Sequence, residues 1–198
     1  MSAEVSVLFD GYSRVGGKIM KANCSCTLIK SKNVNVLVDT MTPWDKEKII
    51  NSLKINHSLN TQDIHYLVCT HGHSDHIGNN NLFLNATHIV GKSVSKNDEY
   101  DLEAFDNDVN YIINEDIEIL ATPGHTLDSV SVKVKTSKGI YVIAGDLFEH
   151  ENDLENEDIW KDAGSEDEKL QEKNRNKMLK MADFIVPGHG PMFKVNKQ

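Results

Sequence analysis

The stretch Thr70-His71-Gly72-His73-Ser74-Asp75-His76 places three histidines and one aspartate within six consecutive positions, 71–76. It follows the apolar run Leu67-Val68-Cys69, so residues 64–69 predict a strand that ends in the histidine cluster. Imidazole nitrogens and carboxylate oxygens are the ligands that zinc and iron accept. The stretch therefore predicts a metal site in preference to a polar surface loop that is merely rich in histidine.

Three further candidate ligands follow other predicted strands. His125, Asp146 and His189 come after apolar runs at residues 117–121, 140–144 and 184–186. Glycine or proline stands next to each of these residues, where the chain must turn sharply and allow a close approach. Because all of them lie at strand ends, we expect them to converge with the 70–76 segment on one site.

The candidate ligands are too many for one tetrahedral zinc ion. They suit two divalent metal ions that share a bridging carboxylate. Zinc is the favoured metal, with iron and manganese as alternatives. The seven candidates are His71, His73, Asp75, His76, His125, Asp146 and His189.

The rest of the chain alternates predicted strands with helices. Strands are expected at 5–9, 25–29, 34–38, 87–90 and 130–134, and helices at 43–53 and 166–181. Thr42 is the expected N-cap of the first helix, with Pro43 at its first position. The acidic segment 149–168 predicts a solvated loop, with Ile159-Trp160 as its anchor. These elements predict one domain over residues 1–198, with two sheets face to face and helices outside.

Composition excludes several classes of function. The formal net charge of −9 argues against a broad basic surface that grips nucleic acid. No run of about 18 apolar residues predicts a membrane span, and the start of the chain predicts no secretory signal. The three cysteines predict buried thiols in a reducing compartment, without a disulfide framework.

The pattern His71-x-His73-x-Asp75-His76, followed in order by His125, Asp146 and His189, resembles the metallo-β-lactamase superfamily over nearly the whole chain. The resemblance implies an α/β fold, a four-layer αββα sandwich of two mixed β-sheets flanked by helices, with the site at one edge. It assigns His71, His73 and His125 to one metal, and Asp75, His76 and His189 to a second metal, with Asp146 bridging. It further implies hydrolysis by a hydroxide held between the two ions, with Asp75 as the catalytic residue that orients the attacking oxygen.

Flanking segments narrow the resemblance to a glyoxalase II-like branch of the superfamily. They include Val38-Asp39-Thr40, the run from Ala144 to Glu149, and Pro187-Gly188-His189-Gly190-Pro191. That branch implies an endoribonuclease that hydrolyses the 3′ end of histone pre-mRNA, with RNA as its partner. It also implies a cytosolic and nuclear protein that forms homodimers. Two alternatives stay open: a glyoxalase II-like hydrolase of thioesters or small esters, and an oxidoreductase with one iron, as in persulfide dioxygenases.

The sequence also suggests residues around the site. Asp39 and Thr70 are candidates for fixing the orientation of the histidines. RNA could be held by cations at the site mouth (Arg14, Lys18, Lys21) and by stacking on Tyr12, Trp44 or Trp160, although each aromatic is equally explained by packing. His150 is a candidate general acid, and an exposed loop histidine is the simpler interpretation.

Overall fold

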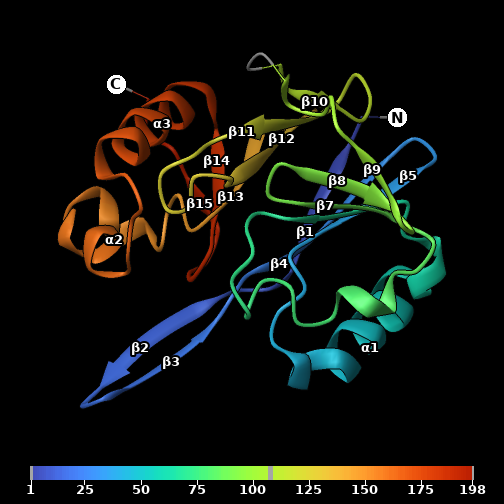
Figure 1. The fold of residues 1–198 in the computed structure, drawn as a ribbon, viewed down its shortest axis with the longest axis horizontal. Helices are drawn as coiled ribbons and strands as arrows, with labels where there is room; N and C mark the ends of the chain where they lie inside the picture. The colour runs from blue at the N-terminus through green and yellow to red at the C-terminus, as the bar shows by residue number, and fades with distance from the viewer. Residues whose placement is uncertain (1, 107–108, 198) are drawn as a thin grey trace.

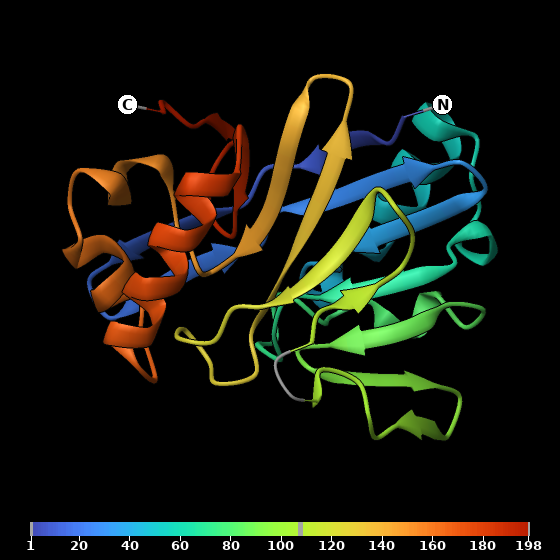
Figure 2. The same cartoon turned by 90° about the horizontal axis from the view of Figure 1, so that it is seen from above.

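The computed structural model describes residues 2–106 and 109–197. Two β-sheets pack face to face, with α1 outside one sheet and α3 outside the other (Figure 1, Figure 2). The order of layers is therefore helix, sheet, sheet, helix, and the expected four-layer α/β sandwich is confirmed.

The first sheet is mixed, because β5–β6 and β6–β7 are parallel pairs and the other neighbours are antiparallel. β4 and β5 form a hairpin around the polar turn at residues 32–33. In spatial order the strands are β1 (Glu4–Phe9), β4 (Cys26–Ser31), β5 (Val34–Val38), β6 (Tyr66–Cys69), β7 (Thr87–Val90), β8 (Ser93–Lys96) and β9 (Glu99–Asp101).

The second sheet is also mixed, with one parallel pair, β13–β14. Parallel pairing brings the carboxyl ends of these two strands to the same edge, so the loops that follow them are neighbours. In spatial order the strands are β10 (Tyr111–Ile112), β11 (Ile117–Ala121), β12 (Val130–Thr136), β13 (Gly139–Gly145), β14 (Phe184–Pro187) and β15 (Phe193–Lys194).

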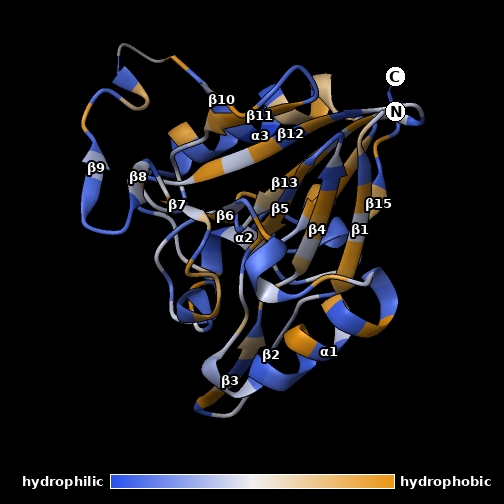
Figure 3. Ribbon diagram, turned by 90° about the vertical axis from the view of Figure 1, so that its right-hand side faces the viewer, coloured by the Kyte–Doolittle hydropathy of each residue, from blue (hydrophilic) through white to orange (hydrophobic). Residues whose placement is uncertain are grey.

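Period-two alternation along the strands separates three apolar layers. In β5, Val36 and Val38 face the second sheet, whereas Leu37 faces α1. In β13, Ile143 faces the first sheet, whereas Val142 packs on α3. Figure 3 shows hydrophobic residues concentrated on strands such as β1, β4 and β12. Burial on both faces of each sheet fixes strand register, because a slip of one residue would exchange the two layers.

The helices are α1 (Lys46–His57), α2 (Asp158–Asp162) and α3 (Glu168–Met181), with short 3-10 turns η1 (Pro43–Asp45), η2 (Thr61–Asp63), η3 (Asn80–Leu82) and η5 (Glu151–Leu154). The first predicted helix needs a correction. Thr42 precedes η1 and makes no capping bond, and the α-helix begins at Lys46 and continues to His57. None of the helices in the described residues is long and apolar enough to span a membrane.

The expectation of a solvated loop at 149–168 is wrong. This segment contains η5 and α2, and the buried Trp160 holds it against the body, as Ile159-Trp160 suggested. A buried ion pair between Asp153 and Arg175 of α3 also fixes it. The acidic composition concealed this order because most of the other carboxylates do face solvent.

A two-stranded arm was not predicted. It consists of β2 (Tyr12–Gly16) and β3 (Ile19–Asn23), which pair only with each other and extend away from the sandwich (Figure 1). Its side chains are largely exposed, so burial left no periodic signal in the sequence.

Candidate metal centre

All seven predicted ligands lie at one edge of the two sheets. Residues 71–76 follow β6, His125 follows β11, Asp146 follows β13 and His189 follows β14. Strands from both sheets thus deliver side chains to one place, and the predicted convergence is what the structure shows.

The first donor cluster consists of His71, His73, His125 and Asp146. His73 Nδ1 lies 2.8 Å from His71 Nε2 and 3.1 Å from His125 Nε2. Asp146 Oδ2 lies 3.6 Å from His71 Nε2 and 3.4 Å from His125 Nε2. Ligands about 2.0–2.1 Å from a tetrahedral zinc ion lie about 3.3 Å from one another, so these four atoms match the edges of such a tetrahedron.

The second donor cluster consists of Asp75, His76 and His189, with Asp146 shared. His76 Nε2 and Asp146 Oδ1 lie 3.2 Å apart in the interior, yet neither has a hydrogen-bond partner among the described residues. Buried polar atoms without partners are rare, and a cation between them would satisfy both. Asp146 Oδ2 lies 3.2 Å from His189 Nε2, and Asp75 Oδ2 lies 3.8 Å from it.

Hydrogen bonds outside the clusters set which nitrogen of each histidine faces inward. His125 Nδ1 donates to the backbone oxygen of Gly164 (2.8 Å), and His189 Nδ1 donates to that of Asn23 (3.1 Å). His76 Nδ1 lies 3.1 Å from Asp39 Oδ2. The proton is thereby held on Nδ1 in all three, which leaves Nε2 free to bind a metal.

Thr70 and Asp39 have the positions that the sequence suggested. The backbone nitrogen of Thr70 donates to Asp39 Oδ1 at 2.8 Å, and Thr70 Oγ1 lies within 3.2 Å of both Asp39 oxygens. Thr70 Oγ1 is also 3.2 Å from His71 Nδ1. The pair therefore orients histidines of both donor clusters.

The pKa values of the histidines are shifted in opposite directions in the two donor clusters. Burial lowers the pKa values of His71 and His125, which keeps them in the neutral form that binds metal. Burial also opposes the charging of His76 and His189, but the carboxylates around them together outweigh it: Asp146 and Asp39 for His76, and Asp146 and Glu149 for His189. Both pKa values are raised, that of His189 to about 9. The pKa of Asp146 is lowered because His76, His189 and His71 together outweigh its own burial.

Close packing explains why glycines flank the ligands. A Cβ on Gly188 would lie 1.9 Å from Asp146 Oδ1, and a Cβ on Gly145 would lie 2.4 Å from Thr70 Oγ1. Gly145 also has a φ of +54°, in the left-handed region. Both positions need glycine so that loops from different strands can meet.

Helix α3 holds the ligand loops through buried polar side chains. Gln171 Nε2 donates to the backbone oxygen of Asp146 (3.0 Å), and Asn174 Nδ2 donates to that of Pro123 (2.7 Å). Arg175 Nη1 donates to the backbone oxygen of Leu147 (2.8 Å). The buried face of α3 therefore carries polar residues because they hold the ligand loops in place.

Sequence reasoning missed Glu149, three residues after Asp146. Its side chain is buried, and its carboxylate Oε2 lies 3.9 Å from His189 Nε2. Burial and the neighbouring Asp146 raise its pKa to about 9. The available signal was an acidic residue placed directly after the apolar pair Leu147-Phe148.

The cations suggested for the site mouth lie elsewhere. In the β2–β3 register, Arg14 and Lys21 share one face of the arm, whereas Val15 and Met20 share the other. The second face lines the cavities at the site, and none of the three suggested cations does. Trp160 is fully buried and cannot stack on a ligand, whereas Trp44 and Tyr12 are exposed.

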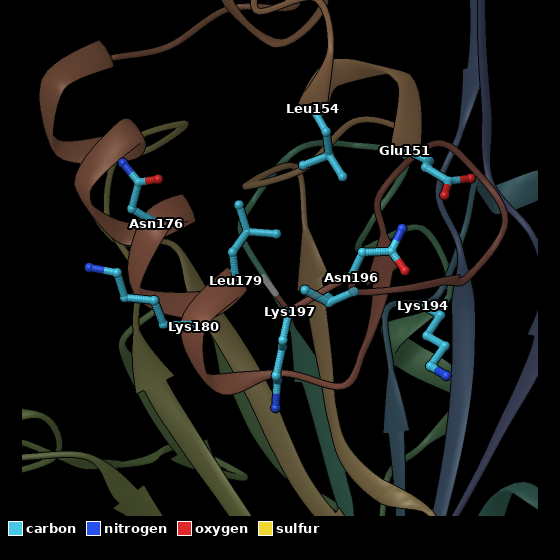
Figure 4. Close-up of a pocket in the computed structure, with 9 residues that line it drawn as sticks. Glu151, Leu154, Asn176, Leu179, Lys180, Lys194, Asn196 and Lys197 are labelled. Carbon is cyan, nitrogen blue, oxygen red and sulfur yellow. The ribbon is translucent and has the colours of Figure 1, made fainter.

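Two adjoining cavities open at the donor clusters. One, of about 400 Å³, is lined by His73, Asp75, His125, Asp146, Glu149 and His189, together with arm residues. The other, of about 380 Å³, has apolar walls from Val15, Met20, Ile159 and Ala163, and includes His150. A cavity of about 540 Å³ beside α3 and the C-terminal segment has no histidine in its lining (Figure 4). Of these three cavities, the first two open onto the donor residues.

Comparison with known proteins agrees with this geometry. The family model of the metallo-beta-lactamase superfamily matches residues 20–189. This chain belongs to the metallo-β-lactamase superfamily. It is 45% identical to metallo-beta-lactamase domain-containing protein 1 of Xenopus laevis, over 98% of this chain and 82% of that protein. It is 38% identical to the human protein of the same name, covering 82% of this chain but only 60% of the human protein.

Solved structures of the superfamily share the fold. A crystal structure of an N-acyl homoserine lactone hydrolase, with N-hexanoyl-L-homoserine bound at its catalytic metal centre, superposes with a TM-score of 0.68. The alignment covers 95% of this chain and 92% of that chain at 18% identity, so it establishes the fold alone. Superfamily membership and the donor clusters together identify a metallo-hydrolase whose site fits divalent metals.

Proposed function

We propose that this protein is a two-metal endoribonuclease that hydrolyses single-stranded RNA, with the 3′ end of histone pre-mRNA as the expected substrate. The hydrolase part rests on one observation: two donor clusters share the buried Asp146, and one of them leaves His76 Nε2 and Asp146 Oδ1 without partners. His71, His73 and His125 would hold one ion, and Asp75, His76 and His189 the other, with Asp146 between them.

Bound at these positions, two divalent ions supply Lewis acidity toward the scissile phosphoryl oxygen and lower the pKa of water. The protein positions the groups that react. Asp75 is half-buried on the cavity wall, 3.8 Å from His189 Nε2, and its carboxylate can orient the attacking oxygen and accept its proton. Val15, Met20 and Ile159 form an apolar wall on one side.

The RNA part is supported by sequence resemblance and by the cationic face of the arm. Arg14 and Lys21 lie directly opposite each other, and no ion pair involving either occurs within the described residues. Like charges opposite each other destabilise a hairpin, so a polyanion on this face would relieve the repulsion. This face offers a path for the phosphate backbone along the arm, on the side opposite the one that lines the site cavities.

Cleavage of a labelled single-stranded RNA tests the proposal. We expect cleavage by the wild type and by the Asp98→Ala control, which removes an exposed carboxylate at the β8–β9 turn. Asp75→Ala should abolish cleavage while circular dichroism shows the fold unchanged. RNA cleavage that survives Asp75→Ala would contradict the proposal. Elemental analysis of protein purified without added metal should find two divalent ions per chain, with zinc expected. One iron per chain would favour the oxidoreductase alternative.

A second candidate is hydrolysis of a small ester, thioester or lactone. The apolar walls of the 380 Å³ cavity favour it, because they fit an acyl chain beside the donor clusters. The same variants assayed on a thioester and on an acyl lactone separate the two candidates. Hydrolysis of these substrates without RNA cleavage would replace the first proposal by the second.

A further inference from the structure

Glu149 is a buried carboxylate that the superfamily pattern leaves without a role. Its side chain is 7% exposed, and Oε1 has no hydrogen-bond partner among the described residues. Burying a carboxylate without a partner is costly. Asp146 and Asp153 repel its charge, whereas His189 and His76 attract it. Arg175 is paired with Asp153.

The carboxylate lies beside the second donor cluster. Donor atoms of Glu149, Asp146 and His189 all lie within 4.8 Å of one another. Glu149 Oε2 is 3.9 Å from His189 Nε2, nearly the same distance as Asp75 Oδ2, at 3.8 Å. Glu149 therefore shares Asp146 and His189 with the second donor cluster, whereas Asp75 belongs to it through His76 and His189.

The surrounding backbone fixes Glu149 relative to the ligands. Its backbone oxygen accepts a hydrogen bond from the backbone nitrogen of His189 at 2.9 Å, so the two residues are directly linked. Its own backbone nitrogen donates to Asp153 Oδ2 at 2.8 Å, and Asp153 is held by Arg175. Such outer contacts typically hold metal ligands in place.

We propose that Glu149 is an additional donor to the second metal ion, a role that rests on the two-metal site of the proposed function. The second position would then combine two imidazoles, from His76 and His189, with carboxylates from Asp75, Asp146 and Glu149. The first position combines three imidazoles with one carboxylate. Because carboxylates suit harder ions, the second position binds Mn²⁺ relative to Zn²⁺ more favourably than the first position does.

Equilibrium dialysis of the full chain against buffered Zn²⁺ or Mn²⁺, with elemental analysis of bound metal, tests this assignment. Glu149→Gln keeps the shape of the side chain but removes its charge. We expect it to keep the first ion with unchanged affinity and to raise the dissociation constant of the second ion about 10–100-fold. Glu149→Asp keeps the charge and should restore part of that affinity. Glu151→Gln, an exposed residue two positions away, is the matched control and should bind both ions as the wild type does.

The outcomes separate this inference from the function on which it rests. Wild-type protein that binds two ions, with Glu149→Gln binding both equally well, overturns the role of Glu149 alone. Wild-type protein that binds only one ion overturns the two-metal site and this inference with it. If Glu149→Gln does not fold, as judged by circular dichroism, Glu149→Asp decides. Wild-type affinity of the second position for both Zn²⁺ and Mn²⁺ overturns the assignment. Weaker binding at the second position, with the first position unchanged, supports it.

Discussion

Asp39 and His76 form a buried pair in which Asp39 Oδ2 lies 3.1 Å from His76 Nδ1. Asp39 has a φ of +59°, a conformation that asparagine tolerates well. Asp39→Asn should therefore fold but present an amide hydrogen toward His76. We expect metal affinity to fall about 10–100-fold, measured by competition with a chelator. Asp116→Asn, on the far side of the fold, should leave the metal affinity unchanged. Equal metal affinity in the two variants would contradict the role of Asp39.

The Arg175–Asp153 pair should dominate the stability of the segment that carries Glu149. Arg175 Nη2 lies 2.7 Å from Asp153 Oδ1, and the guanidinium stacks on Phe148, 4.2 Å from its ring centroid. Arg175→Met leaves Asp153 buried and unpaired, and should cost about 3–5 kcal/mol in the free energy of unfolding, measured with urea. Lys177→Met, exposed on the same helix, should stay within about 0.5 kcal/mol of the wild type. A small effect of Arg175→Met would show that solvent reaches the pair.

Substitution by alanine should have different effects at two glycines near the ligands. At Gly188 the added Cβ would lie 1.9 Å from Asp146 Oδ1, whereas at Gly72 it would meet no atom within 4 Å. Gly188→Ala should displace the shared carboxylate, weaken binding of both metals and cost about 1–3 kcal/mol in unfolding free energy. Gly72→Ala should match the wild type in metal stoichiometry and thermal unfolding. Full metal binding by Gly188→Ala would show that the loops can separate without loss.

Asp45 should make stability depend on acid pH. Burial favours its neutral form, but hydrogen bonds from Lys48, Thr42 and Asn23 outweigh that effect and lower its pKa below the ordinary 3.8. A carboxylate with a lower pKa in the folded state stabilises fully above its unfolded pKa and loses this contribution as pH falls through the folded value. The difference in unfolding free energy between wild type and Asp45→Asn should therefore be constant from pH 7 to about 5 and shrink toward pH 3. A difference that grows on acidification would reverse the assigned direction.

Charge reversal on the arm should separate RNA binding from stability. Arg14→Glu places a carboxylate opposite Lys21, which should stabilise the hairpin while weakening RNA binding and reducing its salt dependence. Fluorescence anisotropy of labelled RNA at several salt concentrations measures both the affinity and its slope. Lys54→Glu, exposed on α1, makes the same charge change in another layer and should have a smaller effect. Equal weakening by both variants would indicate a response to net charge alone.

The sequence could predict the elements whose residues carry a periodic or local signal. Strands β5, β7 and β11 were predicted with the bounds that the structure has, because each is a short run with β-branched and apolar residues between turn residues. The arm gave no such signal because its residues are exposed, and the acidic segment was misinterpreted because two buried side chains, Asp153 and Trp160, fix it.

The sequence by itself determined the superfamily and the seven residues that meet at the site, because a metal centre needs particular side chains at fixed spacing after strands. Only the tertiary structure decided what surrounds them. Asn23, Gly164 and Glu149 contact the histidines across long stretches of chain or through packing. Backbone oxygens carry no residue signature, and the burial of a carboxylate depends on which loops pack over it.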